Sequence, residues 1–208
     1  MKKYNFSLIE LLIVIGILGA LCTLILPGFG NAEADAKEKV VLTEMKEAQS
    51  AFRRFSNDVM LKSNITKMED ILKYGLWPLM KESHPAGLSI AYSDYDPDTG
   101  IGRRGPYLQY EDKVTISSTP EAGGQATSGS GTDIPVMKDP YGGYYRVLCP
   151  EILSGDTDTA KKNKLRRMVL ICTGPNGQLE TPNTNLEDNN IKAQGDDMVI
   201  RLMPMASY

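Results

Sequence analysis

The sequence of 208 residues predicts an α+β protein in which a long N-terminal helix packs on a small antiparallel β-sheet. Three observations favour this fold class: an uncharged apolar run near the N-terminus, an amphipathic helical pattern that continues it, and short β-prone runs among turn-forming residues in the second half. We expect a leader over residues 1–5, an apolar half of the helix over 6–30, an amphipathic half over 31–60 and a globular head over 61–208.

The apolar half of the helix contains a single charged residue, Glu10. At about 1.5 Å of rise per residue, a run of this length can cross a hydrocarbon core of about 30 Å, so we expect a transmembrane helix. Lys2 and Lys3 precede the run and acidic residues follow it, which predicts a cytoplasmic N-terminus and an exported head. Pro27 lacks a backbone N–H and is expected to kink or loosen the helix.

Glu10 is the residue in this run that most needs an explanation. A carboxylate in the hydrocarbon region is costly, so we expect Glu10 to have a partner. Taken alone, the run is equally compatible with a plain single-pass anchor whose acid lies close to the cytoplasmic interface.

The amphipathic half carries apolar residues spaced alternately four and three apart, which is one face of a helix. These residues are Val41, Met45, Ala48, Phe52, Phe55 and Val59. We expect this face to pack against the sheet. A short second helix is predicted to begin with a capping box at Thr66 and to be ended by Gly75 and Pro78.

Two β-prone runs, 144–149 and 167–173, are expected to form strands of a hairpin. Cys149 would lie at the loop end of this hairpin and Cys172 well up the other strand, so both thiols are expected to be buried and reduced. The Ser-, Thr- and Gly-rich stretch 117–132 is predicted to be a flexible surface insertion.

The region before these strands is predicted to be mostly loop, with one short strand at 88–92. The acidic stretch 94–100 fails the EF-hand template, because its Gly comes one place late and no Glu occupies the twelfth position. We interpret it as a turn in which Asp side chains bond their own backbone.

Charge and motif content argue against two classes of function. Acidic residues outnumber basic ones 26 to 23, so nothing draws the chain generally toward nucleic acid. The single histidine, His84, has no catalytic, zinc-binding or P-loop motif around it. We expect neither a nucleic-acid partner nor enzymatic activity.

The junction between leader and apolar run, FSLIELLIVIGILG at 6–19, resembles the N-terminus of type IV prepilins and of the pseudopilins of type II secretion. The resemblance implies cleavage by a prepilin peptidase between Asn5 and Phe6 and N-methylation of Phe6. It also implies that Glu10 pairs with the N-terminal amine of a neighbouring subunit. The family usually has Gly where this chain has Asn5.

Two further blocks, GPYL at 105–108 and KDPYGGYY at 138–145, resemble the major pseudopilin of type II secretion in particular. CTGPNG at 172–177 and GDDMV at 195–199 resemble the calcium loop of those proteins. The resemblance implies calcium as a cofactor. The ligands that it implies are Asp196 and Asp197, with Asn176 where the family has aspartate.

A turn-rich loop whose Asn and Asp side chains bond their own backbone is the alternative to that calcium site.

The resemblance also implies a function. The chain would be a structural subunit held in the bacterial inner membrane with its head in the periplasm. A membrane assembly platform with an ATPase would draw it, together with other pseudopilins, into a homo-oligomeric helical filament. Two alternatives remain open: a type IV pilin for adhesion, motility or DNA uptake, which usually carries a C-terminal disulfide loop, and a membrane-tethered periplasmic enzyme or binding module.

Overall fold

The computed structural model describes residues 7–59, 65–80, 95–109, 112–116, 128–186 and 191–203, with only the backbone described for 23–31, 112–116, 128–133 and 183. The leader, His84, the strand predicted at 88–92 and most of the predicted insertion therefore lie outside the described residues. The chain divides into two compact units, Met1–Val40 and Val41–Tyr208.

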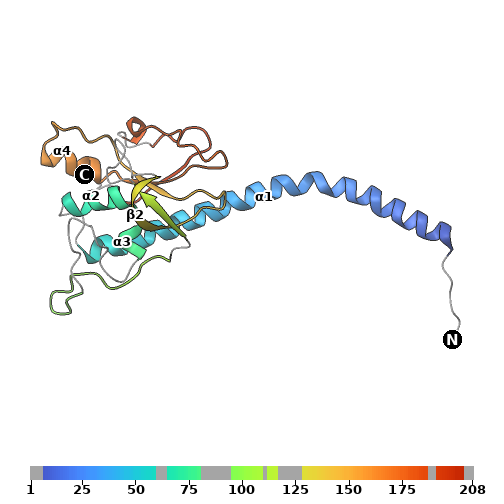
Figure 1. Ribbon diagram of the computed structural model, residues 1–208, viewed down its shortest axis with the longest axis horizontal. Coiled ribbons are helices and arrows are strands. Elements are labelled where there is room, and N and C mark those ends of the chain that lie inside the picture. Colours follow the sequence, from blue (N-terminus) through green and yellow to red (C-terminus); the bar gives the residue numbers. More distant parts are fainter. Residues whose placement is uncertain are drawn as a thin grey trace. The chain divides into compact units, whose positions relative to one another are not determined.

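Helix α1, Leu8–Asp58, is the longest element of the chain (Figure 1) and confirms the helix predicted from periodicity. It continues through Pro27 without interruption. Its residues up to Val40 belong to the first unit and those from Val41 to the second. Within the described residues, no helix has a stretch both long and apolar enough to cross a membrane.

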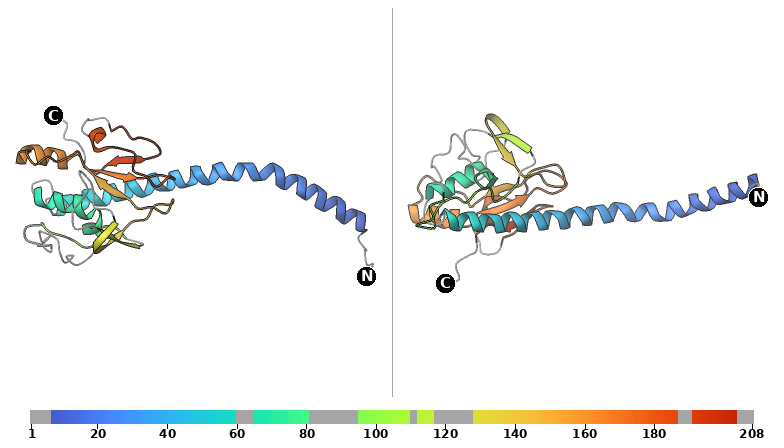
Figure 2. Two further views of the ribbon diagram at one scale, coloured as in Figure 1. Left: turned by 45° about the horizontal axis from the view of Figure 1, so that its top comes forward. Right: turned by 90° about the horizontal axis from the view of Figure 1, so that it is seen from below.

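The apolar stripe on the second part of α1 is confirmed as a core face. Its five side chains, and that of Val59 directly after the helix, are at most 2% exposed. They share one core with residues of the sheet, including Val147, Leu170 and Cys172. Figure 2 shows the orange and red strands of this sheet lying along the cyan part of α1. The second part of α1 therefore belongs to the head because its apolar face is buried there.

The main sheet has three antiparallel strands in the order β3, β4, β5. Their bounds are Arg146–Leu148, Val169–Cys172 and Met198–Arg201. Successive side chains point to opposite faces of a strand. Leu170 and Cys172 accordingly join the core with α1, while Val169 and Ile171 join a second cluster with Leu186. The two predicted strands thus pair antiparallel and are shorter than expected, but the connection between them, residues 149–168, contains a helix and is not a hairpin turn.

Helix α2, Ile65–Tyr74, confirms the second predicted helix but not its predicted cap. Thr66 lies inside the first turn, because the helix begins one residue earlier, so it is not the N-cap. Gly75 follows the helix with a φ of 62°, the left-handed conformation that commonly ends helices. Pro78 lies in the next short helix, α3, Trp77–Met80, where the first turn tolerates a residue without an N–H.

A second, two-stranded sheet pairs β1, Asp112–Ile116, with β2, Ser128–Val136. The prediction of a flexible insertion over 117–132 is therefore wrong for residues 128–132, which are part of β2. A shift of register follows Thr115, which pairs with Asp133 while the next residue pairs with Ser128. Pairing satisfies backbone groups regardless of side chain, so a polar composition does not exclude a strand.

Helix α4, Asp158–Leu165, and the 3-10 helix η2, Asn183–Leu186, were not predicted, and neither were α3 and β1. The Thr157 side chain accepts a hydrogen bond from the N–H of Ala160 at 3.3 Å and so caps α4. Of the residues in α4, only Leu165 is buried. The described chain is an α+β protein with a small antiparallel three-stranded sheet.

Candidate functional site

Glu10 lies in the first turn of α1, where it completes part of a capping box. The backbone N–H of Ser7 donates to Oε2 of Glu10 at 2.9 Å, and the backbone N–H of Glu10 donates to the Ser7 carbonyl at 3.1 Å. The pattern Ser-x-x-Glu at 7–10 is the sequence signal for this cap, and we did not anticipate it. Glu10 therefore has a local partner at the start of its own helix. Asn5 and Phe6 lie outside the described residues.

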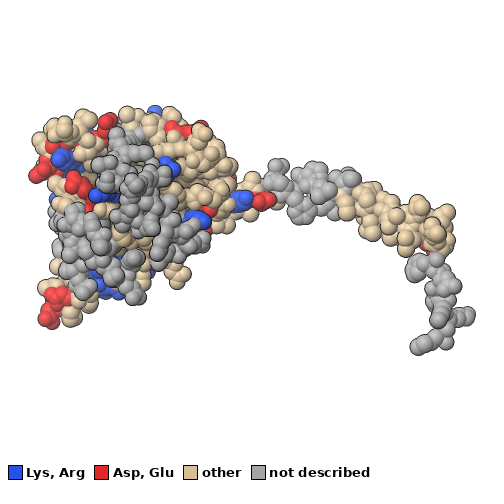
Figure 3. All heavy atoms as spheres, in the orientation of Figure 1, with Lys and Arg blue, Asp and Glu red and all other residues tan. Residues whose placement is uncertain are grey.

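The first part of α1 exposes its apolar side chains on every side. Their exposed fractions run from 83% at Leu8 to 49% at Leu21. Figure 3 shows this stretch as an uncharged surface apart from a small acidic spot near its beginning. An apolar surface of this extent on a folded chain marks contact with a membrane or with other protein.

The three predicted calcium ligands lie in the loop before β5, where Asn176 contacts Asp196 and Asp197 contacts a different segment. The backbone N–H of Asn176 donates to Oδ2 of Asp196 at 3.0 Å. The N–H groups of Glu180 and Thr181 donate to Oδ2 of Asp197 at 2.9 and 2.6 Å. Asp196 and Asp197 therefore tie two separate segments of the loop to the start of the last strand. The Asn176 side chain bonds its own turn, since its Oδ1 accepts the N–H of Gln178 at 2.6 Å.

A third carboxylate in this loop, that of Glu180, was not anticipated. Its Oε2 accepts the N–H of Asp196 at 3.3 Å. It also lies over Gly195, where a Cβ atom would overlap with that oxygen. Gly195 has a φ of +60°, so both backbone conformation and space favour glycine there. Glu180 is separated from the acidic pair by 16 residues, which is why sequence spacing did not indicate it.

The chemistry of this loop fits a hard cation. Asp197 is only 6% exposed, and Oδ1 of both Asp196 and Asp197 is buried without a hydrogen-bond partner. Carboxylate and carbonyl oxygens are the ligands that calcium prefers. Among the described residues, however, no group of three or more His, Cys, Asp or Glu side chains is arranged to hold a metal ion. Calcium binding therefore stays a prediction.

The DPYGG turn at 139–143 is organised by the buried carboxylate of Asp139. Its Oδ1 accepts the N–H groups of Tyr141 and Gly143 at 2.9 and 3.0 Å, and its Oδ2 accepts the thiol of Cys172 at 3.5 Å. Burial raises the pKa of the Cys172 thiol to about 12, so the thiol stays protonated and can donate. Cys149 and Cys172 are both buried and free, as expected.

Tyr145, the last residue of the KDPYGGYY block, contacts α1. The Tyr145 hydroxyl donates to Oε2 of Glu44 at 2.5 Å. Burial, and then this hydrogen bond to a carboxylate, raise the pKa of Tyr145. In the GPYL block, Tyr107 packs edge-on against Phe55 and its hydroxyl donates to Asp58 at 2.8 Å. The GPYL and KDPYGGYY blocks therefore both hold the second part of α1 against the rest of the head through side-chain contacts.

The acidic stretch near residue 96 is a turn, as interpreted. Its Asp96 carboxylate accepts the N–H of Asp98 at 2.9 Å and the hydroxyl of Thr99 at 2.8 Å. These hydrogen bonds lower the pKa of Asp96, with the N–H of Asp98 contributing most.

Comparison with family models, with curated proteins and with solved structures found no match to this chain. What it does is therefore inferred from its own residues.

Proposed function

We propose that the chain is a structural subunit of a type II secretion pseudopilus, which assembles from the inner membrane into a helical filament. One observation carries the proposal: the junction FSLIELL at 6–12, with its single carboxylate, stands at the start of the long helix α1. The GPYL and DPYGGYY blocks favour secretion over a pilus.

The exposed apolar part of α1 supports an assembly role. Side chains such as Leu8, Leu12 and Leu18 are more than half exposed in the isolated chain, which is costly in water. Before assembly, lipid would cover residues 6–30. In the filament, the helices of neighbouring copies would take its place and bury the same surface.

Glu10 would give each new subunit its position along the filament. Its carboxylate accepts the N–H of Ser7 through Oε2 and is exposed. The N-terminal amine that cleavage creates at Phe6 on a neighbouring copy would supply the opposite charge. An ion pair in a low-dielectric surrounding requires close geometry, so a misplaced subunit would leave the carboxylate unpaired and be disfavoured.

Calcium, if bound, would act on the stability of the head. Asp196 and Asp197 would supply their unpartnered oxygens, and Asn176 could add an amide oxygen. The ion would neutralise the two adjacent carboxylates and hold the loop to the start of β5. The structural role is to keep this loop in one conformation for contact with other copies.

A type IV pilin is the nearest alternative, since it shares the N-terminal junction. Such pilins usually have a C-terminal disulfide loop, whereas Cys149 and Cys172 are free thiols here, tied to Pro150 and Asp139 by hydrogen bonds. A membrane-tethered enzyme or binding module is the alternative of another class. It would keep residues 1–5 and remain monomeric.

Mass spectrometry of the mature N-terminus, in cells that contain the assembly machinery, tests the proposal. We expect the mature chain to begin at a methylated Phe6 and to be recovered in filaments. A mature protein that retains residues 1–5 and stays monomeric under these conditions would show that the proposal is wrong. Filaments recovered from the cell surface, with no effect of their loss on secretion, would favour the type IV pilin instead.

A further inference from the structure

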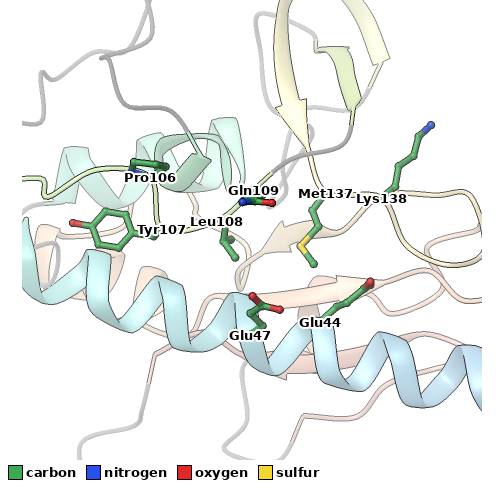
Figure 4. A pocket seen from close by; sticks show the side chains of 8 residues that line it. All are labelled: Glu44, Glu47, Pro106, Tyr107, Leu108, Gln109, Met137 and Lys138. Atoms are coloured by element: carbon green, nitrogen blue, oxygen red, sulfur yellow. The ribbon is translucent and has the colours of Figure 1, made fainter.

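A groove of about 600 Å³ lies in the head between α1 and two segments that precede the main sheet. Its lining residues are Glu44, Glu47, Pro106, Tyr107, Leu108, Gln109, Met137 and Lys138. Figure 4 shows the side chains of Glu44 and Glu47 projecting from α1 toward Leu108 and Met137, while the amine of Lys138 points away from both carboxylates. The groove thus combines apolar side chains with two acids.

The two acids lack a basic partner within the described part of the chain. They stand three residues apart on one helix, and the positions three and four residues from either one hold no Lys or Arg. No ion pair among the described residues includes Glu44 or Glu47. Like charges at this spacing disfavour each other unless a cation lies between them. Among the described residues, Glu44 accepts a hydrogen bond from the Tyr145 hydroxyl.

A cationic side chain with a long apolar stem fits such a groove. Lys and Arg bury their methylene groups on apolar surface while the charged end stays with acids or water. Here Leu108 and Met137 would contact the stem, and Glu47 would pair with the charge. The ligand class is therefore a lysine- or arginine-bearing segment of protein.

The described chain has one segment with a large surplus of such side chains, at α4 and the turn after it. Five of the seven residues 161–167 are Lys or Arg, in a chain whose net charge is −3. Lys164 is already paired with Asp156 at 2.8 Å. The remaining four, Lys161, Lys162, Arg166 and Arg167, form no ion pair with described residues. They are partly exposed.

The groove and α4 lie at different ends of the head. In Figures 1 and 2, α4 lies at the end of the head where α1 finishes. Glu44 and Glu47 precede Asp58, the last residue of α1, by 14 and 11 residues, or roughly 21 and 16 Å at about 1.5 Å per residue. α4 therefore does not reach the groove of its own copy, so a contact between the two surfaces would have to join two copies.

We propose that the acidic groove of one copy receives the basic side chains of residues 161–167 from a second copy of this chain. The contact is heterologous, because two different surfaces meet, and a heterologous contact that does not close produces an open filament. This inference rests on the proposed function, since it names the contact between heads in that filament.

Disulfide cross-linking of the full-length chain, produced with its assembly machinery, tests the contact. In a Cys22→Ser background, one tagged copy carries Gln109→Cys in the groove and a differently tagged copy carries Asn163→Cys in α4, so that every proposed charge stays in place. Cys149 and Cys172 are buried and do not compete. The matched control places the groove-side Cys at Arg53, an exposed residue of α1 outside the groove, instead of at Gln109. We expect the groove pair to form about tenfold more linked product than the control, as electrostatic pairing between copies implies.

Charge reversal provides the second measurement. Glu47→Lys should lower filament yield, counted by electron microscopy, by about tenfold, and adding Lys161→Glu with Lys162→Glu should restore it. Glu47 is exposed, so circular dichroism should show an unchanged fold.

Filaments in the wild type with equal cross-linking in the pair and the control would overturn the contact but leave the proposed function standing. Cross-linking without any filament would support the contact and overturn the proposed function. If neither cross-linked product nor filaments are found, the contact and the proposed function are both overturned. Restored yield without selective cross-linking would also overturn the contact, because the two surfaces would then interact only through their general charge.

Discussion

Glu10 satisfies two requirements of its position with one carboxylate. At the first turn of a helix the backbone N–H groups have no intrahelical partner, and the helix dipole favours negative charge. Oε2 of Glu10 accepts the N–H of Ser7 at 2.9 Å, so the acid is stabilised by its own helix before any partner arrives. A neighbouring amine would therefore add a charge partner to an acid that is already oriented.

At the same residue scale, Asp196 and Asp197 each leave one buried oxygen unpartnered. We predict that replacing both with Asn removes a calcium-dependent part of stability. At calcium concentrations of about 100 times the dissociation constant, binding would stabilise the folded wild type by about 2.7 kcal/mol, and the variant would lose this increment. Thermal unfolding of each protein, with calcium and with a chelator, measures it.

The matched control is Asp35→Asn, which removes an exposed carboxylate far along the sequence from the loop. Its melting temperature should respond to calcium as the wild type does. If the wild type melts at the same temperature in calcium and in chelator, no ion is bound at Asp196 and Asp197. The loop is then held by its hydrogen bonds alone.

Sequence reasoning found part of this loop. Of the implied calcium ligands, Asn176 and Asp196 are in contact, since the Asn176 N–H donates to the Asp196 carboxylate, while calcium binding itself stays a prediction. Glu180 was missed because its role depends on how the chain returns over Gly195, which no local spacing encodes. The Ser-x-x-Glu cap at Glu10 was missed for another reason. Glu10 was interpreted as a charge within a membrane helix, so the Ser-x-x-Glu pattern at 7–10 was not interpreted as a helix cap.

At the scale of elements, periodicity decided what could be predicted. The buried stripe of α1 repeats over five intervals, so its direction was clear from sequence. Helix α4 buries only Leu165, and with a single anchor there is no period to detect. The start of β2 at Ser128 was missed because its residues are small and polar, while its strand pairing depends on residues 112–116.

Helix α4 is held to the preceding loop by Asp156, which supports a prediction about pH. The hydrogen bond from Lys164, followed by that from the N–H of Leu153, lowers the pKa of Asp156. A carboxyl whose pKa is lower in the folded state stabilises the fold above its unfolded pKa of about 3.9, and this contribution disappears as pH falls through the folded value.

We therefore predict that Asp156→Asn melts at a lower temperature than the wild type at pH 7, and that the difference closes as the pH falls below about 4. Thermal unfolding followed by circular dichroism across this range measures the gap. Glu151→Gln is the control, since Glu151 contacts Lys164 only through its backbone carbonyl. A gap that stays constant at every pH would show that the Asp156 carboxylate is not the source of the difference.

At the scale of the whole molecule, the chain carries two kinds of surface that its own fold leaves without partners. The first part of α1 exposes apolar side chains, and the head exposes acids and bases that form no ion pair with described residues. Apolar helix surface supplies association strength but little positional selectivity. Charges such as Glu10 and Glu47 contribute little to strength at exposed positions, but they distinguish one register from another. An assembling subunit needs both.

This division of roles leads to a prediction that separates capping from assembly at Glu10. Glu10→Leu removes both the acceptor for the Ser7 N–H and the negative charge, whereas Glu10→Gln keeps an amide oxygen that can accept that N–H and removes only the charge. Both variants should insert into the membrane at least as well as the wild type, because an ionised group has been removed from the apolar run.

If the charge pairs with a neighbouring amine, both variants should lower filament number by about tenfold or more, because each leaves that amine without its charged partner. Electron microscopy of filaments, with membrane fractionation of the unassembled chain, measures assembly and insertion separately. Normal filaments from Glu10→Gln together with few from Glu10→Leu would mean that capping of α1, rather than pairing with an amine, is what assembly requires. Normal filaments from both would remove Glu10 from the mechanism and leave apolar burial as the determinant of register along the first part of α1.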